Sequence, residues 1–176
     1  VFKFGGGVLK ETNDIDQMIH ILENYKNDQL IIVVSAFNKI TGKFEKLLNT
    51  YFENNTFDTL LFNQIKEFHI SFAKSVCKGD TLKNTLLSYF NEIENIFQEG
   101  LGNNYHYEYD RIVSFGEILS SIIIFEVLKK QFADVEFVDI RDMILTDSVF
   151  TEAKVEWEKS TDKIRRKCLH TNSRIF

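Results

Sequence analysis

Residues 1–7, Val-Phe-Lys-Phe-Gly-Gly-Gly, form a short apolar run that holds one lysine and closes on three glycines. This pattern predicts a strand that delivers a positive charge to a turn. Three adjacent glycines permit positive φ and close backbone approach, and successive amides in such a turn can hold an anion such as phosphate. The spacing fits neither a Walker loop nor GxGxxG. A tight turn with a surface lysine is the plainer interpretation, and both stay open at this point.

A helix and a second strand follow this turn. Apolar residues from Ile15 to Tyr25 recur at helical spacing and predict a helix over about 13–26. Residues 30–34, Leu-Ile-Ile-Val-Val, are a continuous β-branched run of the kind buried on both faces of a parallel sheet. Strand, helix and strand then make one βαβ unit, and residues 35–43 leave it as a polar loop.

The middle of the chain is predicted to be a helical block over 43–133. Its periodicity favours helices at about 60–76, 82–97 and 105–132. Residues 134–139 return to a strand pattern, and the charged segment 152–167 is partly helical. The fold class is therefore α/β, with strands near 1–5, 29–35 and 134–139 adjacent in a mostly parallel sheet that helices cover on both faces.

Composition excludes several classes of function. The 176 residues are 44% hydrophobic with net charge −5, and no basic cluster interleaved with aromatics marks a nucleic-acid surface. The apolar run 122–125 is far too short for a membrane span, and no leader pattern opens the chain, so we expect a cytoplasmic protein. Cys77 and Cys168 are isolated and the histidines are scattered, so we expect reduced thiols and no metal site built from protein ligands.

A second polar group lies at residues 113–121, Val-Ser-Phe-Gly-Glu-Ile-Leu-Ser-Ser. Glu117 is the one acid of this stretch, whose other residues are apolar or small. Such a carboxylate is either solvated at a helix start or held in a cleft to receive a cation. Ser35 and Thr41 have an equally plain interpretation as turn and cap hydroxyls.

Four motifs together resemble aspartokinase in order and spacing, over nearly the whole chain. They are Lys3-Phe4-Gly5-Gly6; Val33-Val34-Ser35-Ala36 with Lys39 and Thr41; Ser114-Phe115-Gly116-Glu117-Ile118-Leu119-Ser120-Ser121; and Asp139-Ile140-Arg141 with Thr146-Asp147. The first two are shared across the amino-acid kinase superfamily, and the third points to aspartokinase itself. The resemblance implies a three-layer αβα sandwich. It also implies Mg²⁺-ATP-dependent phosphorylation of the side chain of L-aspartate to 4-phospho-L-aspartate, the entry to lysine, threonine and methionine biosynthesis.

The resemblance also assigns roles to residues. Lys3 is the catalytic residue and binds the ATP phosphates with Gly5, Gly6 and Gly7, because a lysine beside glycine amides can offset charge on a transferring phosphate. By similarity, the substrate is bound by Ser35, Thr41 and Glu117, where the carboxylate receives the ammonium group. We expect these residues to face one cleft at the carboxyl ends of the strands. Asp139 and Arg141 are expected to form a structural pair.

The chain departs from the family pattern at Gly7, Val8, Asn38 and Ile40, where hydroxyl or glycine residues are usual. The family also continues past Phe176 with a nucleotide-binding half and regulatory ACT domains. Residues 1–176 would then be the N-terminal, substrate-side part of a kinase domain, inactive alone. We expect homo-oligomers, or pairing of the tail 168–176 with another chain, to cover the sheet edge. Two alternatives stay open: a kinase for glutamate, acetylglutamate, carbamate or a nucleotide, and a degenerate, non-catalytic metabolite-binding homologue.

Overall fold

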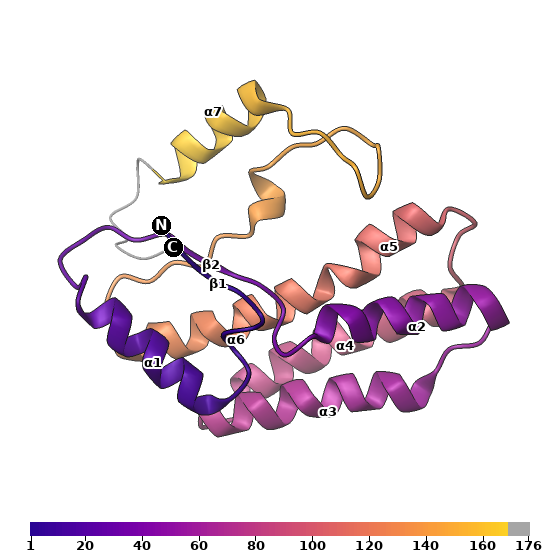
Figure 1. Ribbon diagram of the computed structural model, residues 1–176, viewed down its shortest axis with the longest axis horizontal. Helices are drawn as coiled ribbons and strands as arrows, with labels where there is room; N and C mark the ends of the chain where they lie inside the picture. Colours follow the sequence, from indigo (N-terminus) through magenta and orange to yellow (C-terminus); the bar gives the residue numbers. More distant parts are fainter. Residues whose placement is uncertain (169–176) are drawn as a thin grey trace.

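One pair of strands is followed along the chain by a run of helices (Figure 1). The computed structural model describes residues 1–168. The elements are β1 (Phe2–Phe4), α1 (Thr12–Glu23), β2 (Ile32–Val34), α2 (Ile40–Asn54), α3 (Thr59–Val76), α4 (Thr81–Glu99), α5 (Tyr105–Val113), α6 (Phe115–Gln131), the 3₁₀ turn η1 (Ile140–Asp142) and α7 (Trp157–Cys168). The expected tail contact of residues 168–176 lies outside this description.

The two strands pair in parallel through the α1 crossover. Phe2, Lys3 and Phe4 lie opposite Ile32, Val33 and Val34. Helix α1 starts at Thr12, where the carboxylate of Asp14 accepts the amide hydrogens of Lys10 and Glu11 at 2.8 and 2.9 Å. The predicted strand–helix–strand order is confirmed, although β2 is shorter than the expected 29–35.

One face of this pair is open. Side chains alternate across a strand, so Phe2, Phe4 and the β2 residues opposite them turn toward the core, while Lys3 and Val33 turn away. Ile31 and Val33 are 41% and 43% exposed. The expectation that β2 is buried on both faces is therefore wrong, because the described helices cover only its inner face, where α6 contacts β2.

The third expected strand, at 134–139, is not formed within residues 1–168. Phe137 instead packs its ring on Phe125 of α6, with centroids 5.5 Å apart. A hollow lined by Ile32 and Val34 on one side and by residues 135–138 on the other separates this segment from β2. A strand needs a neighbour at about 4.8 Å, and β2 does not provide one here. The described sheet is two-stranded, and a three-layer sandwich is not seen in it.

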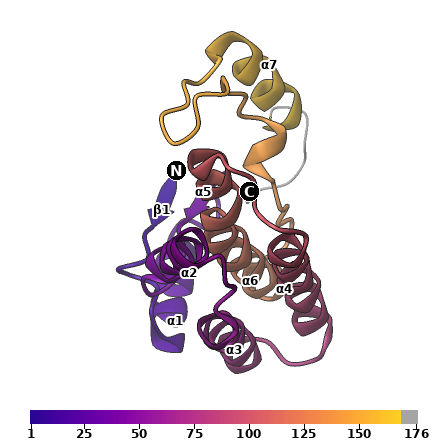
Figure 2. The same ribbon diagram turned by 90° about the vertical axis from the view of Figure 1, so that its right-hand side faces the viewer.

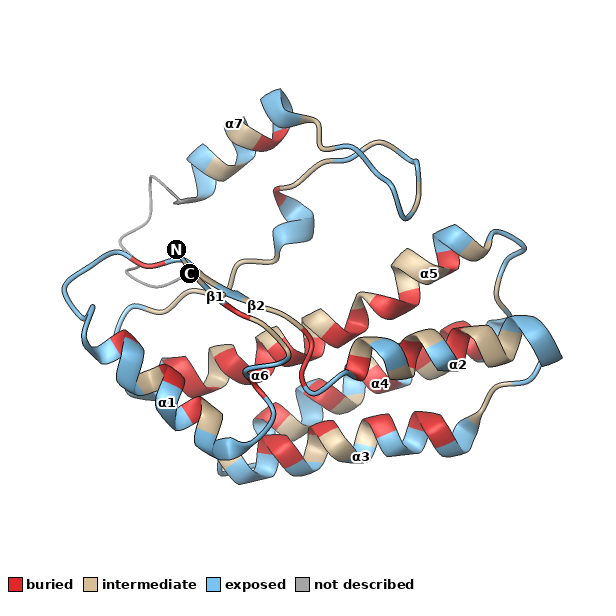
Figure 3. Cartoon of the chain, in the orientation of Figure 1, coloured by how far each residue is buried: buried red, intermediate tan, exposed pale blue. Residues whose placement is uncertain are grey.

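The helical block predicted over 43–133 is confirmed by α2 to α6, which pack together around α6 and which we call the helical layer. Helix α6 lies at its centre and contacts α2, α3, α4, α5 and β2. Figure 3 shows buried residues around much of its surface, as its near-continuous apolar sequence requires. The helix expected over 105–132 is divided at Ser114, which ends α5 and precedes α6.

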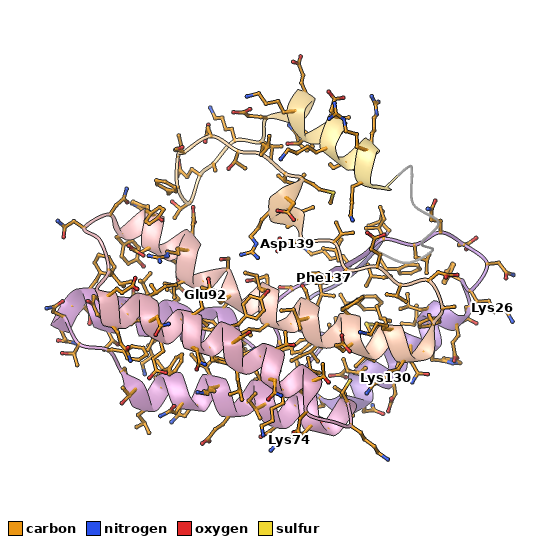
Figure 4. The ribbon with its side chains drawn as sticks, turned by 180° about the vertical axis from the view of Figure 1, so that it is seen from behind. Lys26, Lys74, Glu92, Lys130, Phe137 and Asp139 are labelled. Carbon is orange, nitrogen blue, oxygen red and sulfur yellow. The ribbon has the colours of Figure 1, made fainter. Side chains whose placement is uncertain are left out.

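Residues 140–168, which we call the arm, project from this layer (Figures 1 and 2). The arm holds η1, a turn closed by an antiparallel bridge between Thr146 and Val155, and α7. It reaches back to α5 at Thr151, whose amide donates to Asp110 at 2.9 Å. Figure 4 labels Asp139 where the chain enters the arm. Within residues 1–168, no helix combines the length and apolar character that crossing a bilayer requires.

Candidate active site

The glycine turn after β1 is defined by close approach rather than by positive φ. The carbonyl of Gly5 accepts the amides of Val8 at 2.9 Å and Leu9 at 3.2 Å. None of Gly5, Gly6 and Gly7 has a positive φ, so the expectation of left-handed glycines does not apply here. A methyl group built on Gly6 would lie 2.1 Å from the carbonyl oxygen of Ala36, and one on Gly5 or Gly7 would meet nothing within 4 Å. Only position 6 requires glycine for space.

Ala36 is the point where three distant segments meet. Gly6 packs on its carbonyl, and a methyl group built on Gly116 would lie 3.0 Å from its Cβ atom. Glu117 approaches the Ala36 amide, which donates to Oε1 at 3.4 Å. We call Gly6, Ala36, Phe37, Gly116 and Glu117 the Ala36 junction. The glycine turn, the end of β2 and the start of α6 are thus brought together at Ala36, a residue to which the motifs assigned no role of its own.

Glu117 lies in the first turn of α6 and is half-buried. Within residues 1–168 it makes no ion pair, so its carboxylate charge is not neutralised by a described side chain. It borders a largely apolar cavity of about 440 Å³, which is also lined by residues 31–34 of the sheet and by Arg141, Met143 and Ile164. A partly desolvated carboxylate at the edge of such a cavity is suited to receive a cationic group.

The remaining predicted residues lie on adjacent segments but do not line this cavity. Lys3 is exposed in the middle of β1, on the open face. The amide of Ser35 donates to the Phe4 carbonyl at 3.1 Å and so extends the strand pairing toward the glycine turn. Thr41 is half-buried in the first turn of α2. One enclosed cleft shared by all four residues is therefore not found, and their roles stay predictions.

Two consecutive left-handed residues lead from β2 into α2. Asn38 and Lys39 have φ of 40° and 60°, and the amide of Ile40 donates to the Phe37 carbonyl at 2.8 Å. Asparagine is enriched in this conformation, which is the one signal in the sequence that could have found this turn. Asn38 and Ile40 are also positions where the chain departs from the family pattern. Ile40 is fully buried, with a side-chain atom 3.6 Å from a methyl group built on Gly116.

Asp139 and Arg141 form the structural pair that the sequence predicted. The guanidinium donates from Nε at 2.9 and 3.1 Å and from Nη2 at 2.6 Å, so both carboxylate oxygens are engaged. The Arg141 hydrogen bonds hold the pKa of Asp139 below its usual range, and the Asp139 carboxylate raises the pKa of Arg141. Both groups are partly exposed, so water weakens the pair. Its role is to fix the chain as it enters the arm.

Residues 1–168 contain no group of three or more His, Cys, Asp or Glu side chains arranged to hold a metal ion. Mg²⁺ in nucleotide sites is usually held by phosphate oxygens and one or two carboxylates. We assign none of the described residues to the metal.

One family model matches most of the chain, and several known proteins are similar to it. The model of the Amino acid kinase family matches residues 1–174. Two curated proteins, both named bifunctional aspartokinase/homoserine dehydrogenase 2, chloroplastic, are each 22% identical to the chain. The one from Arabidopsis thaliana aligns over 154 residues, 84% of this chain and 17% of that protein, and the one from Zea mays over 152 residues, 82% and 16%. The chain thus spans about a sixth of the length of these relatives.

Solved structures give the same answer for the fold. E. coli aspartokinase III, in complex with aspartate and ADP, superposes with a TM-score of 0.80 at 17% identity, over 95% of this chain and 37% of that one. The Clostridium acetobutylicum aspartate kinase superposes with a TM-score of 0.75 at 22% identity, over 98% and 37%. The resemblance drawn from the four motifs is confirmed, and the fold of residues 1–168 is the aspartokinase fold, rich in helices with a small parallel sheet.

Proposed function

The chain belongs to the amino acid kinase family, and we propose that it is the acceptor-binding part of an ATP-dependent aspartate kinase. The observation that carries this proposal is the convergence of the Gly6 turn and the Glu117 carboxylate on Ala36. A turn with free space beside two of its glycines suits phosphate, and an unneutralised carboxylate suits an ammonium group. An amino acid with a phosphorylated side chain carries both a phosphate and an ammonium group. One such small molecule would therefore contact the glycine turn and Glu117 at the same time.

In the proposed reaction, a side-chain carboxylate oxygen of L-aspartate attacks the γ-phosphorus of ATP. The new P–O bond forms as the bond to ADP breaks, and 4-phospho-L-aspartate and ADP result. Phosphoryl transfer depends mostly on positioning and charge neutralisation, so Lys3 and the amides of residues 5–7 would offset charge on the transferring phosphate. Glu117 would hold the substrate ammonium, and Ser35 and Thr41 would donate hydrogen bonds to its carboxylates.

The chain is much shorter than the solved structures on which it superposes. The chain covers 37% of the structures it superposes on, so the activity of the whole protein is proposed rather than observed. We assign residues 1–176 to the substrate-side part of a kinase domain, with Mg²⁺ entering on the nucleotide. A place at the start of lysine, threonine and methionine biosynthesis, a cytoplasmic location and homo-oligomer formation stay predictions.

The test is a coupled ADP-release assay on the full-length gene product, with L-aspartate and L-glutamate as competing acceptors. We expect release with aspartate and little with glutamate. Glu117→Gln should weaken aspartate binding about ten-fold to a hundred-fold, because it removes a charged acceptor. Glu126→Gln is the matched control, since Glu126 lies on the same helix and pairs with Lys129.

Other outcomes of this assay select the alternatives. Release with glutamate, acetylglutamate, carbamate or a nucleotide, but not with aspartate, would assign another kinase of the family. No release with any acceptor would favour a non-catalytic homologue, which the departures at Val8 and Ile40 suggest. Equal aspartate binding by Glu117→Gln and Glu126→Gln would remove Glu117 from the site.

A further inference from the structure

Two neighbouring serines in α6 have different partners. Ser120 Oγ donates to the Gly116 carbonyl at 2.8 Å, and Ser121 Oγ donates to the Glu117 carbonyl at 2.7 Å, each one turn back along the helix. Ser120 Oγ also accepts the amide of Phe37 at 3.0 Å, across 83 positions of sequence. Ser121 has no such tertiary partner among the bonds of the described residues. Within residues 1–168, Ser121 therefore makes only a local hydrogen bond, whereas Ser120 also joins two segments of the chain.

The bond to Phe37 lies in an otherwise apolar contact. Ser120 and Phe37 are both fully buried, and the Phe37 ring packs on Phe72 with centroids 4.8 Å apart. The Phe37 amide is beyond the end of β2, so the strand ladder does not use it. A buried amide without a partner is unfavourable, and Ser120 is the group that satisfies this one.

This bond lies next to the contact between Ala36 and Glu117. The apolar contact of Ala36 with Gly116 has no preferred direction, and the bond from the Ala36 amide to Glu117 is long at 3.4 Å. The 3.0 Å bond from the next amide is shorter, fully buried and directional. Ser120 is therefore better suited than Glu117 to fix residues 35–37 against α6.

We propose that Ser120 is a positioning residue, which holds residues 35–37 against α6 and so sets how the Glu117 carboxylate faces the Gly6 turn. Its effect on catalysis rests on the proposed function, whereas its effect on the loop does not. The chemistry requires an acceptor of serine size at position 120, because the site is closed and Gly116 lies one turn away. Removal of the hydroxyl should release the Phe37 amide and leave the helix itself intact.

The first experiment measures amide hydrogen exchange at Phe37 in the 176-residue chain. Ser120→Ala should speed exchange at Phe37 about ten-fold, which corresponds to the loss of one buried hydrogen bond, while amides of α4 keep their protection. Ser121→Ala is the matched control and should leave Phe37 unchanged. If Ser120→Ala does not fold, Ser120→Cys replaces it, because sulfur keeps the volume and is a weak acceptor. Equal Phe37 exchange in the serine, alanine and cysteine forms would overturn the proposal.

The second experiment uses the full-length gene product and compares kinetic constants. A positioning role predicts that Ser120→Ala raises KM for the acceptor amino acid, with KM for ATP unchanged, and that Ser121→Ala alters neither. A merely structural role predicts fewer active molecules, with both KM values unchanged, and would overturn the catalytic part. If the wild-type protein does not phosphorylate aspartate, the proposed function fails, and the exchange at Phe37 still decides whether Ser120 fixes the loop.

Discussion

The Ala36 junction and the interior of the helical layer are both buried, yet they are packed in different ways. At the junction, glycine and alanine bring backbones into contact, and a single methyl group added at Gly6 would overlap a carbonyl oxygen. Between α3 and α4, large rings fill the space, as where Phe90 packs on Phe62 and His69. The layer thus derives its stability from buried volume, while the junction fixes positions. Substitutions should therefore lower stability in the layer and misplace groups at the junction.

The largest effect on stability is expected in the layer. Phe90 is fully buried, and the centroid of its ring lies 5.8 Å from that of Phe62 and 5.6 Å from that of His69. Phe90→Ala should lower the free energy of unfolding by about 3–5 kcal/mol, because a cavity remains where the ring was. Chemical denaturation of the 176-residue chain measures it, with Phe52→Ala, at a side chain 36% exposed, as the milder control. A loss below about 1 kcal/mol would show that the layer collapses around the gap.

Substitution of Lys3, near the junction, should lower turnover rather than stability. Lys3→Ala in the full-length gene product should reduce kcat about 10² to 10³-fold, by analogy with the removal of one preorganised donor. Its thermal stability should not change, since Lys3 is exposed. Lys26→Ala is the control, because Lys26 is also exposed but lies in the turn that follows α1 (Figure 4). Near-normal turnover in Lys3→Ala would exclude Lys3 from the mechanism.

Gly6 and Gly7 belong to one turn but have different surroundings. Gly6→Ala places a methyl group 2.1 Å from the Ala36 oxygen and should lower the free energy of unfolding by about 1–3 kcal/mol, as overpacking does. Gly7→Ala meets nothing within 4 Å at a φ that is not positive, so it should be neutral or slightly stabilising. Thermal melts of the two variants would give equal midpoints if the turn were free to move away from Ala36.

A fall in pH should lower the free energy of unfolding through His69, which lies in the helical layer. Burial lowers the pKa of His69 from 6.5 to about 4, its Nδ1 bonds the Ile65 carbonyl, and its Nε2 has no partner within the described residues. A base whose pKa is depressed on folding contributes full stability above pH 6.5, and this stability is lost as the pH falls toward 4. Between pH 7 and pH 5 we expect a loss of about 2 kcal/mol. His69→Leu should remove this part of the pH dependence, and an unchanged pH profile would contradict the assignment.

The sequence was sufficient for features that depend on local pattern. Helices α3 and α4 follow from their periodicity within a few residues, and the Asp139–Arg141 pair from its spacing. Other features depend on what lies alongside. Residues 134–139 have a strand pattern, but pairing depends on the surroundings: a hollow separates this segment from β2, and Phe137 packs on α6. The glycine turn was recognised from the sequence. The reason that position 6 requires glycine is the Ala36 oxygen, which lies 30 residues away and cannot be predicted from a glycine run.

Helix α6 also has a consequence for synthesis on the ribosome. It occupies the centre of the layer and contacts α2, α3, α4 and β2, although it is made after all of them. Between the end of α2 at Asn54 and the end of α6 at Gln131, 77 residues must be added. At ordinary elongation rates this takes about 4–15 s. Until α6 is complete, the faces of β2, α2, α3 and α4 that contact it lack this partner, so the nascent chain exposes apolar surface that only α6 covers.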